Sequence, residues 1–357
     1  MRQRLHNLDL LKTLAMLMVV IIHAVRLEAD VVQYPTIGNY CSLTLRLLCE
    51  GVPIFLLVNG FLLFGKQTFD LSAHLRKTGK LFALLVIWSI ILIGIQYPLH
   101  AVLYGTPIDI TEMFELFLDT KVNSLYSGTL WYLQALVAVY LLFPLFKCAY
   151  DTDGRLFEYL FVVAAVCAGI PALISMASFL PVSETAMSFI SKTQAWFGQM
   201  IPFAGSEFLF YFLLGGMIRK YSAKLELQKN RWTMIGAGAF VLSVFWTISM
   251  GFLGGSVPVF NVNYWGIFEP FIIIGWYCLT LRYHGTPEIA QRITTSVGSL
   301  TLGIYLVHPL VIAAFTAIPL PSMQIVMLIV ALIVFLVSWG ITALAMRIPG
   351  IRWIFRV

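Results

Sequence analysis

Ten apolar runs, each long enough to cross a bilayer, follow one another along the chain and limit what it can fold into. A membrane-spanning helix needs about 20 predominantly apolar residues, and in lipid a helix satisfies its own backbone hydrogen bonds. The sequence therefore predicts an all-α integral membrane protein, a bundle of ten transmembrane helices. The predicted spans are residues 8–25, 43–64, 81–97, 130–146, 156–179, 203–218, 233–252, 265–281, 297–318 and 322–345.

The composition agrees with this fold class. Of the 357 residues, 60% are hydrophobic and 11% are charged, whereas about a quarter of the residues in soluble domains are charged. No polar linker divides the runs, so residues 1–357 are predicted to form one membrane domain. The first run is followed by "VRLEAD" rather than by a small-residue cleavage site, which favours a membrane helix over a signal peptide. The segment "PVSETAMSFISKTQ", between the fifth and sixth runs, is predicted to be a loop.

The distribution of basic residues gives the orientation. Cytoplasmic loops of membrane proteins carry an excess of Lys and Arg. With the N-terminus inside, the outer segments keep only four of the 23 basic residues, which are Arg26, Arg46, Lys121 and Lys192. We therefore expect a multi-pass protein of the cell (plasma or inner) membrane with cytoplasmic N and C termini.

The net charge of +6 has two readings. In the first, the positive charge reflects the orientation in the membrane and attracts the inner face to anionic lipid. In the second, it binds an anionic ligand on the cytoplasmic side. The chain has no phosphate-binding P-loop pattern and no nucleic-acid-binding module. Nucleotide hydrolysis and nucleic-acid partners are therefore not expected.

The five cysteines point to no special chemistry. None forms a CxxC pair, and most fall inside apolar runs. Buried thiols are predicted, rather than a disulfide framework or a metal site.

Two ionisable residues stand in the first apolar run, "LLKTLAMLMVVIIHA". Lys12 and His23 are eleven residues apart, so on a helix they share a face within about 20° and lie about 16 Å apart. Asp9 is three residues before Lys12 and close enough to pair with it. In one interpretation, Lys12 reaches the inner lipid headgroups and His23 packs in the interior of the bundle without a functional role. In the functional interpretation, Lys12 and His23 mark the two ends of a polar track, a path lined by polar groups along this face of the helix. Ionisable groups in membrane helices normally face the bundle interior or a wet cavity.

The start of the second apolar run supports the functional interpretation of Lys12 and His23. Arg46 and Glu50 are four residues apart near its outer end, at about the depth of His23 and Arg26. A histidine can take a proton from a hydroxyl. Glu50 could orient His23, and an arginine could stabilise a developing oxyanion. A polar cavity between the first two helices is therefore predicted.

Four motifs in order resemble the membrane acyltransferase-3 family, bacterial O-acyltransferases of surface glycans. The first helix is similar to the family's basic-x10-His pattern, here Lys12 to His23, opened by "NLDLLKTLAM". The second resembles its "E-x-x-P-x-F…SGFLL" segment, with "EGVPIFLLVNGFLL" here, in which Asn59 replaces the serine and is assigned no chemistry. The others are "GTLWYLQALVAVYLLFPL" and the tyrosine–histidine motif in "LGIYLVHPL". The resemblance covers almost the whole chain and is to stand-alone members without a fused hydrolase-like domain.

The resemblance implies separate roles for Lys12 and His23. The first-helix histidine is the family's presumed base, which carries over to His23, and Lys12 stands where arginine is usual and marks the donor end. The donor would be a cytoplasmic acyl-coenzyme A, usually acetyl-CoA, with Arg76 and Lys77 of an inner loop near its phosphates. The acceptor would be a sugar hydroxyl of a cell-surface or lipid-linked glycan. No permanently bound cofactor is implied.

Other polar and aromatic residues are assigned to the acceptor side. Tyr305 and His308 are three apart and share a helix face. They are expected to form a hydrogen-bonded packing pair, to support the reacting residues from behind, or to belong to the acceptor site. Trp131 at the start of the fourth span fits an aromatic belt or stacks on the sugar. The intramembrane acids Glu207 and Glu269 are expected to line a cavity. The remaining histidines, expected to be solvated at loops or helix ends, are His6, His74, His100 and His284.

Two other function classes stay open. Buried charges and broken helices also describe a transporter for a polar or anionic small molecule, although no repeat relates the two halves. A lipid- or glycan-binding scaffold is the third class. The sequence alone leaves the sugar, the hydroxyl, the acyl chain and the oligomeric state undetermined.

Overall fold

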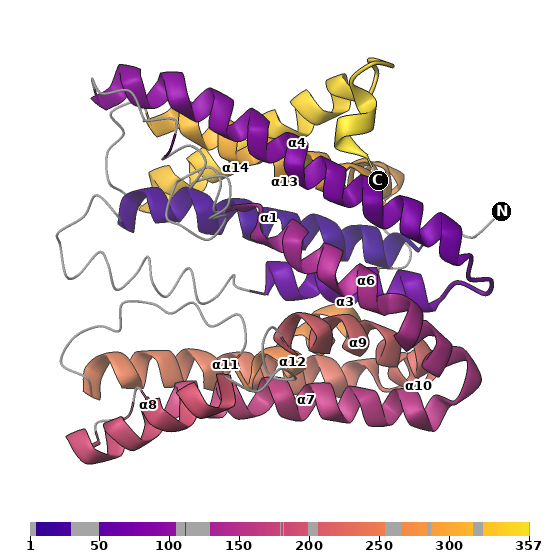
Figure 1. Cartoon of the computed structure of the whole chain (residues 1–357), viewed down its shortest axis with the longest axis vertical. Coiled ribbons are helices and arrows are strands. Elements are labelled where there is room, and N and C mark those ends of the chain that lie inside the picture. The colour runs from indigo at the N-terminus through magenta and orange to yellow at the C-terminus, as the bar shows by residue number, and fades with distance from the viewer. Residues whose placement is uncertain are drawn as a thin grey trace.

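The computed structural model is a helical bundle (Figure 1), and in the residues it describes it has twelve α-helices and no strand. Those residues are 5–29, 50–104, 111, 129–178, 180, 182–198, 206–253, 266–283, 287–316 and 324–356. The helices are α1 (His6–Ala29), α3 (Gly51–Phe64), α4 (Leu71–Tyr104), α6 (Trp131–Thr152), α7 (Gly154–Ala177), α8 (Glu184–Gly198), α9 (Ser206–Lys220), α10 (Ser222–Leu227), α11 (Lys229–Leu253), α12 (Glu269–Thr280), α13 (Glu288–Thr316) and α14 (Gln324–Ala345), followed by the 3-10 turn Arg352–Phe355.

Every predicted span overlaps one of these helices. By length and composition, six described stretches can cross a membrane: His6–Ala24, Leu71–Ile95, Trp131–Thr152, Gly154–Ala177, Glu288–Phe315 and Leu328–Ala345. The other four predicted spans fall on α3, α9, α11 and α12. The all-helical membrane character is confirmed, while the number of ten spans and the side of the termini remain predictions.

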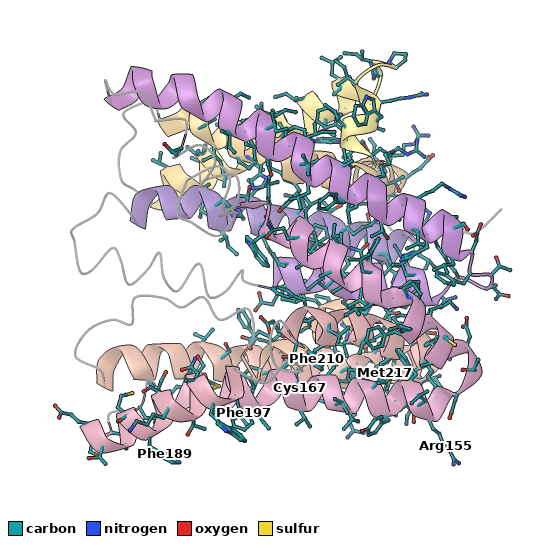
Figure 2. The ribbon with its side chains drawn as sticks, viewed as in Figure 1. Arg155, Cys167, Phe189, Phe197, Phe210 and Met217 are labelled. Atoms are coloured by element: carbon teal, nitrogen blue, oxygen red, sulfur yellow. The ribbon has the colours of Figure 1, made fainter. Side chains whose placement is uncertain are left out.

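Apolar side chains cover the outside of the bundle, as lipid contact requires. On α7, Tyr159, Val162 and Leu173 are more than half exposed, and only 11% of its most apolar window is buried. Figure 2 shows α7 and α8 at one edge of the bundle, with Arg155 at one end of α7.

The loop predicted at "PVSETAMSFISKTQ" is wrong, because most of it belongs to α8. The backbone N–H of Ala186 donates to Ser183 Oγ at 3.4 Å, so a serine caps the start of this helix. Its polar residues lack a long apolar run, which is why hydropathy alone missed it. Phe189 on α8 is 72% exposed (Figure 2).

The third predicted span starts ten residues too late. The structure begins α4 at Leu71, after Asp70, whose carboxylate accepts the backbone N–H of Ala73 at 3.1 Å. An aspartate at this position satisfies N–H groups that a helix start leaves without a partner. Arg76, Lys77 and Lys80 therefore lie on the first turns of α4, and the prediction that they belong to a loop is wrong.

Helices α3 and α9 cross so closely that side chains would not fit between them. A Cβ atom on Gly60 would collide with the carbonyl oxygen of Phe212, and one on Gly215 would collide with that of Leu57. Only glycine permits two helix backbones to approach in this way. Four successive aromatic contacts surround the crossing at Phe64, whose ring meets those of Phe143, Tyr150, Phe157 and Phe212.

Basic residues gather at the end of the bundle where α3 ends and α4 begins. The Arg219 guanidinium at the end of α9 lies 5.1 Å from the Phe61 ring centroid of α3. Lys77 of α4 lies 5.7 Å from the Tyr140 ring centroid of α6, and Lys66 is near enough to act electrostatically on it. In Figure 1 the marked chain ends lie on this same side. This basic end of the bundle agrees with the predicted cytoplasmic side of the termini, and the orientation remains a prediction.

Substituting Gly215 tests the α3–α9 crossing. We expect Gly215→Ala to destabilise the protein by about 1–3 kcal/mol, because the added methyl overpacks the contact with Leu57. Gly94→Ala on α4 is the control, since nothing lies within 4 Å of a Cβ there and alanine favours helix. Thermal unfolding of the detergent-purified variants measures both. Equal melting temperatures for the two variants would contradict this packing.

Candidate functional site

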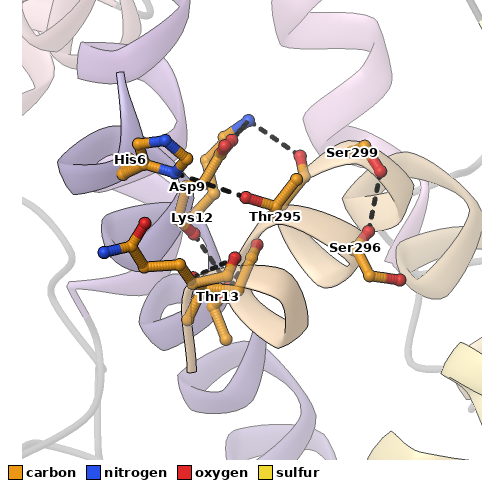
Figure 3. Close-up of polar contacts among 10 residues, drawn as sticks. His6, Asp9, Lys12, Thr13, Thr295, Ser296 and Ser299 are labelled. Atoms are coloured by element: carbon orange, nitrogen blue, oxygen red, sulfur yellow. Dashed lines mark hydrogen bonds and ion pairs between the residues drawn. The ribbon is translucent and has the colours of Figure 1, made fainter. Parts of the chain in front are cut away.

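Lys12 is bound at the start of the contact between α1 and α13 (Figure 3). Its Nζ atom lies 2.7 Å from Asp9 Oδ1 and donates to the carbonyl oxygen of Gly298 at 2.8 Å. The pairing of Asp9 with Lys12 is thus confirmed. A Cβ atom on Gly298 would lie 2.8 Å from Asp9 Oδ1, so glycine at this position leaves room for the ion pair. In the described structure Lys12 joins two helices.

His23 contacts the same helix, α13, further along. Its Nδ1 atom lies 3.4 Å from His308 Nε2, and the two ring centroids are 5.0 Å apart. Because Lys12 meets Gly298 and His23 meets His308, both residues occupy one face of α1, as predicted. The contacts also show that α1 and α13 run parallel.

The predicted polar track along that face is wrong. Ala15 and Val19, which lie between Lys12 and His23, are buried. A Cβ atom on Gly51, the first residue of α3, would lie 2.7 Å from the Ala15 carbonyl oxygen and 2.9 Å from a Val19 methyl carbon. The start of α3 therefore packs on this stripe, and apolar contact fills the space between the lysine and the histidine.

The carbonyl of Val19 fixes the tautomer of His23. It lies 2.8 Å from His23 Nδ1, and a carbonyl oxygen only accepts, so Nδ1 carries the hydrogen. In the neutral ring the lone pair is then on Nε2. His23 is half-buried, and Nε2 is its proton-accepting atom.

His308 is fixed by the backbone of its own helix. Its Nδ1 lies 3.3 Å from the Ile304 carbonyl oxygen. Pro309 has no N–H, so it cannot bond the Tyr305 carbonyl four residues earlier as an ordinary helical residue would. The His308 ring therefore donates through Nδ1, and its Nε2 faces His23 as an acceptor.

Asn59, to which the sequence reading assigned no role, joins two helices, α3 and α6. Its amide nitrogen donates to the Phe55 carbonyl at 2.8 Å and to Tyr132 Oη at 3.2 Å. The Tyr140 hydroxyl donates to Asn59 Oδ1 at 2.9 Å. An amide offers both donors and acceptors, which a serine at this position would not do over the same reach. The sequence signal was present as a polar residue within an apolar helix.

A continuous chain of polar and aromatic side chains connects the basic end to His23. Lys77 lies against Tyr140, which bonds Asn59, which bonds Tyr132. The chain continues by ring contacts from Tyr132 to Tyr305 (5.7 Å), from Tyr305 to His308 (5.9 Å) and on to His23. The Tyr305 hydroxyl also donates to the Thr129 carbonyl. This chain runs through α4, α6, α3 and α13 rather than along α1.

The predicted catalytic Glu50 is buried directly before α3. It precedes Gly51, which packs on Val19, so it lies about one helical turn of α1 from His23. Of its predicted neighbours, Arg46 lies outside the described residues, and Arg26 is on α1 with a side chain outside the description. The roles of all three remain predictions.

The predicted acceptor residues take different positions. Trp131 is half-buried at the start of α6, with its ring 5.7 Å from Phe208 of α9. Arg76, which was predicted to contact the donor, is exposed. Tyr305 and His308 are both buried. Glu207 and Glu269 lie in the first turns of α9 and α12, where the helix dipole favours negative charge.

Two minor predictions are wrong. His74 was expected to be solvated, yet it is buried against Phe143 and its Nε2–H donates to the Tyr140 carbonyl at 2.8 Å. The early start of α4 brings it inside. Cys148 is exposed rather than buried, whereas Cys167 and Cys278 are buried as expected. Among described residues, no group of three or more His, Cys, Asp or Glu side chains could hold a metal.

Comparison with known proteins assigns the family. A family profile described as an acyltransferase domain, that of the acyltransferase 3 family, matches residues 5–344. The chain belongs to the acyltransferase 3 family. No curated protein and no solved structure gave a match. Family membership and the apolar helices together make this chain a membrane acyltransferase of the acyltransferase 3 family.

Removing the Lys12 ammonium tests whether it joins α1 to α13 in this acyltransferase 3 protein. Asp9 is 4% exposed, so we expect Lys12→Met, which removes an ammonium beside a buried carboxylate, to cost about 3 kcal/mol. Arg292→Met is the control, because its pair with Glu288 is more than 70% exposed and such pairs contribute about 1 kcal/mol or less. Thermal unfolding gives both values.

The double variant Asp9→Asn with Lys12→Met separates the ion pair from other roles of the lysine. It removes both charges, so it should recover part of the lost stability. A Lys12→Met protein as stable as Arg292→Met would refute the structural role of the pair.

Proposed function

We propose that the protein transfers an acyl group, acetyl by preference, from cytoplasmic acyl-coenzyme A to a sugar hydroxyl of a cell-surface or lipid-linked glycan. The family supports acyl transfer in the membrane. The observation that carries the residue assignment is the 2.8 Å contact between the Val19 carbonyl and His23 Nδ1. It leaves the lone pair on Nε2, the atom that a general base uses.

The reaction at His23 balances without any other group. The sugar oxygen bonds to the thioester carbonyl carbon while its proton moves to His23 Nε2. The carbon–sulfur bond then breaks, and the departing thiolate takes that proton to leave as the coenzyme A thiol. In the second route that we keep, Nε2 itself bonds to the carbonyl carbon and the carbon–sulfur bond breaks, so that the coenzyme A thiolate leaves. The sugar oxygen then bonds to the carbonyl carbon of the acyl-imidazole, the carbon–nitrogen bond breaks, and the hydroxyl proton passes to the thiolate. Both routes use the same lone pair, and Glu50 remains a candidate for stabilising the positive ring.

The basic end of the bundle supports a phosphate-bearing donor. Lys77, Lys66 and Arg219 lie together there, and among described residues none of the three forms an ion pair with a carboxylate. Cations without acidic neighbours attract anionic groups, and the exposed Arg76 on α4 adds another. The 3′-phosphate and pyrophosphate of coenzyme A suit this end. Lys12, already held by Asp9 and Gly298, is a weaker candidate for contacting them.

The acceptor would approach His23 from the opposite end of the chain of side chains. Trp131 is half-buried near Tyr132 and offers an indole face of the kind that stacks on sugar rings. Arg26 and Arg46 remain proposed acceptor contacts. Lipid surrounds the site, so a lipid-linked sugar could enter sideways.

His23→Gln tests the proposed base. Glutamine keeps the approximate size and a hydrogen-bond donor but cannot take a proton near neutral pH, so we expect acyl transfer to fall by about 10²-fold or more. His6→Gln, on the exposed first residue of α1, should retain wild-type activity. The measurement is transfer of labelled acetyl from acetyl-CoA to membrane glycan, followed by mass spectrometry.

The same preparations distinguish an enzyme from a transporter. Proteoliposomes loaded with glycan and supplied with labelled acetyl-CoA should show release of free coenzyme A that depends on His23. Saturable uptake of a solute without thioester consumption would favour transport instead. Unchanged transfer by a folded His23→Gln protein would refute the base assignment.

Lys77→Met tests the donor end. We expect a several-fold increase in KM for acetyl-CoA with little change in kcat, because the lysine would contact phosphates rather than the reacting atoms. The KM for acetyl-pantetheine, which lacks the 3′-phosphate and the pyrophosphate, should not change. Lys224→Met on the exposed helix α10 is the charge-matched control. Equal increases for both donors would exclude phosphate recognition by Lys77.

A further inference from the structure

His308 is more deeply buried than the base it contacts. Its side chain is 0% exposed, whereas His23 is half-buried. A fully enclosed imidazole is badly placed to touch a sugar, which argues against the expected acceptor contact. Its neighbours are instead the His23 ring, at 5.0 Å between centroids, and the Tyr305 ring.

We propose that His308 is the positioning residue of His23: it accepts the Nδ1–H of His23, holds the ring in the tautomer with its lone pair on Nε2, and stabilises the imidazolium that forms when Nε2 takes a proton. The inference rests on the proposed function, since it assigns His23 as the base. It adds a partner from a helix 285 residues away in sequence.

The direction of the hydrogen bonds carries the proposal. The Ile304 carbonyl can only accept, so His308 Nδ1, 3.3 Å away, is a donor. In a neutral ring the other nitrogen, Nε2, is then an acceptor, and it faces His23 Nδ1 at 3.4 Å. The Val19 carbonyl independently requires a hydrogen on that same Nδ1. Two separate backbone contacts therefore orient the pair in the same sense.

The proline that follows His308 helps to explain why the His308 ring keeps this orientation. Pro309 has no N–H to donate to the helix backbone, and the His308 ring beside it donates to the carbonyl of Ile304. A ring flipped by 180° would present the carbon Cδ2 to the Ile304 carbonyl and lose this hydrogen bond. The acceptor atom is thus aimed at His23 before any substrate arrives.

The Nδ1–H of His23 is shared between the Val19 carbonyl and His308 Nε2. When the ring becomes positive, each acceptor stabilises the charge, because hydrogen bonds from ionised donors are about twice as strong as neutral ones. The low dielectric of the buried pair increases this effect. Because Val19 supplies the shorter bond, losing His308 should weaken catalysis less than losing His23.

The test compares two substitutions of His308 with opposite hydrogen-bonding ability. In His308→Gln the side-chain oxygen can accept at the position of Nε2, and we expect kcat to stay within about tenfold of wild type. His308→Phe keeps a ring of similar size without an acceptor, and kcat should fall by about 10–100-fold, less than the loss of the base itself. KM for acetyl-CoA should not change in either, because the buried ring touches no substrate.

Leu306→Ala is the matched control for packing. Leu306 is 0% exposed on the same helix, so this variant should lower the melting temperature without lowering kcat per folded molecule. A wild-type kcat in His308→Phe, or a kcat in His308→Gln as low as in His308→Phe, would overturn the positioning role. Loss of transfer in His23→Gln alongside either result would leave the proposed function standing.

A spectroscopic measurement keeps the proposal testable if the phenylalanine variant does not fold. In protein labelled with ¹⁵N-histidine, the His23 signals, identified by their absence in His23→Gln, should report a hydrogen on Nδ1 at neutral pH. In His308→Gln the same tautomer should persist. A His23 ring with its hydrogen on Nε2 in the wild-type protein would refute both the bond to His308 and the choice of Nε2 as base.

Discussion

The parallel contact between α1 and α13 is the interaction on which the candidate site depends. At one end Lys12 bonds Asp9 and the Gly298 carbonyl, and at the other His23 meets His308. The hydrogen bond from Lys12 of α1 to the Gly298 carbonyl of α13 limits how far the two helices can slide along each other. A hydrogen bond between two imidazoles tolerates displacements of only a few tenths of an ångström. The lysine thus contributes to the geometry of the histidine pair from three turns away.

The close crossing of α3 and α9 places the second half of the site. Because Gly60 and Gly215 let the two backbones touch, α3 is held deep in the bundle, where Asn59 reaches both Tyr132 and Tyr140. These tyrosines are fully surrounded by protein, and their hydroxyls find partners that lipid could not offer. Gly60 and Asn59, the residue directly before it, therefore serve the same purpose, which is to bring polar groups of separate helices into contact.

Local sequence predicted the features that depend on one helix. Hydropathy located the spans, the three-residue spacing predicted the Asp9–Lys12 pair, and helical periodicity put Lys12 and His23 on one face. Local sequence could not predict the features that depend on how the helices pack together. Nothing in the order of residues says that the face of α1 meets α13, so Tyr305 and His308 were matched to a sugar instead of to His23. Hydropathy also missed the starts of α4 and α8, because a capping Asp70 or Ser183 begins a helix in polar sequence where no apolar run exists.

The packed stripe between Lys12 and His23 decides how a donor could reach the base. Ala15 and Val19 are buried against the start of α3, so a thioester cannot travel along that face of α1 without separating two helices. The side chains that connect Lys77 to His23 lie instead on α6, α3 and α13, and several of them are tyrosines and an asparagine that can exchange hydrogen bonds with a polar arm. The pantetheine of coenzyme A carries two amides and is long and thin. If coenzyme A is the donor, as we propose, an arm with that chemistry would match Tyr140, Asn59 and Tyr132 better than an aliphatic stripe. Under that proposal, donor recognition begins on α4 and α6 rather than at the lysine of α1.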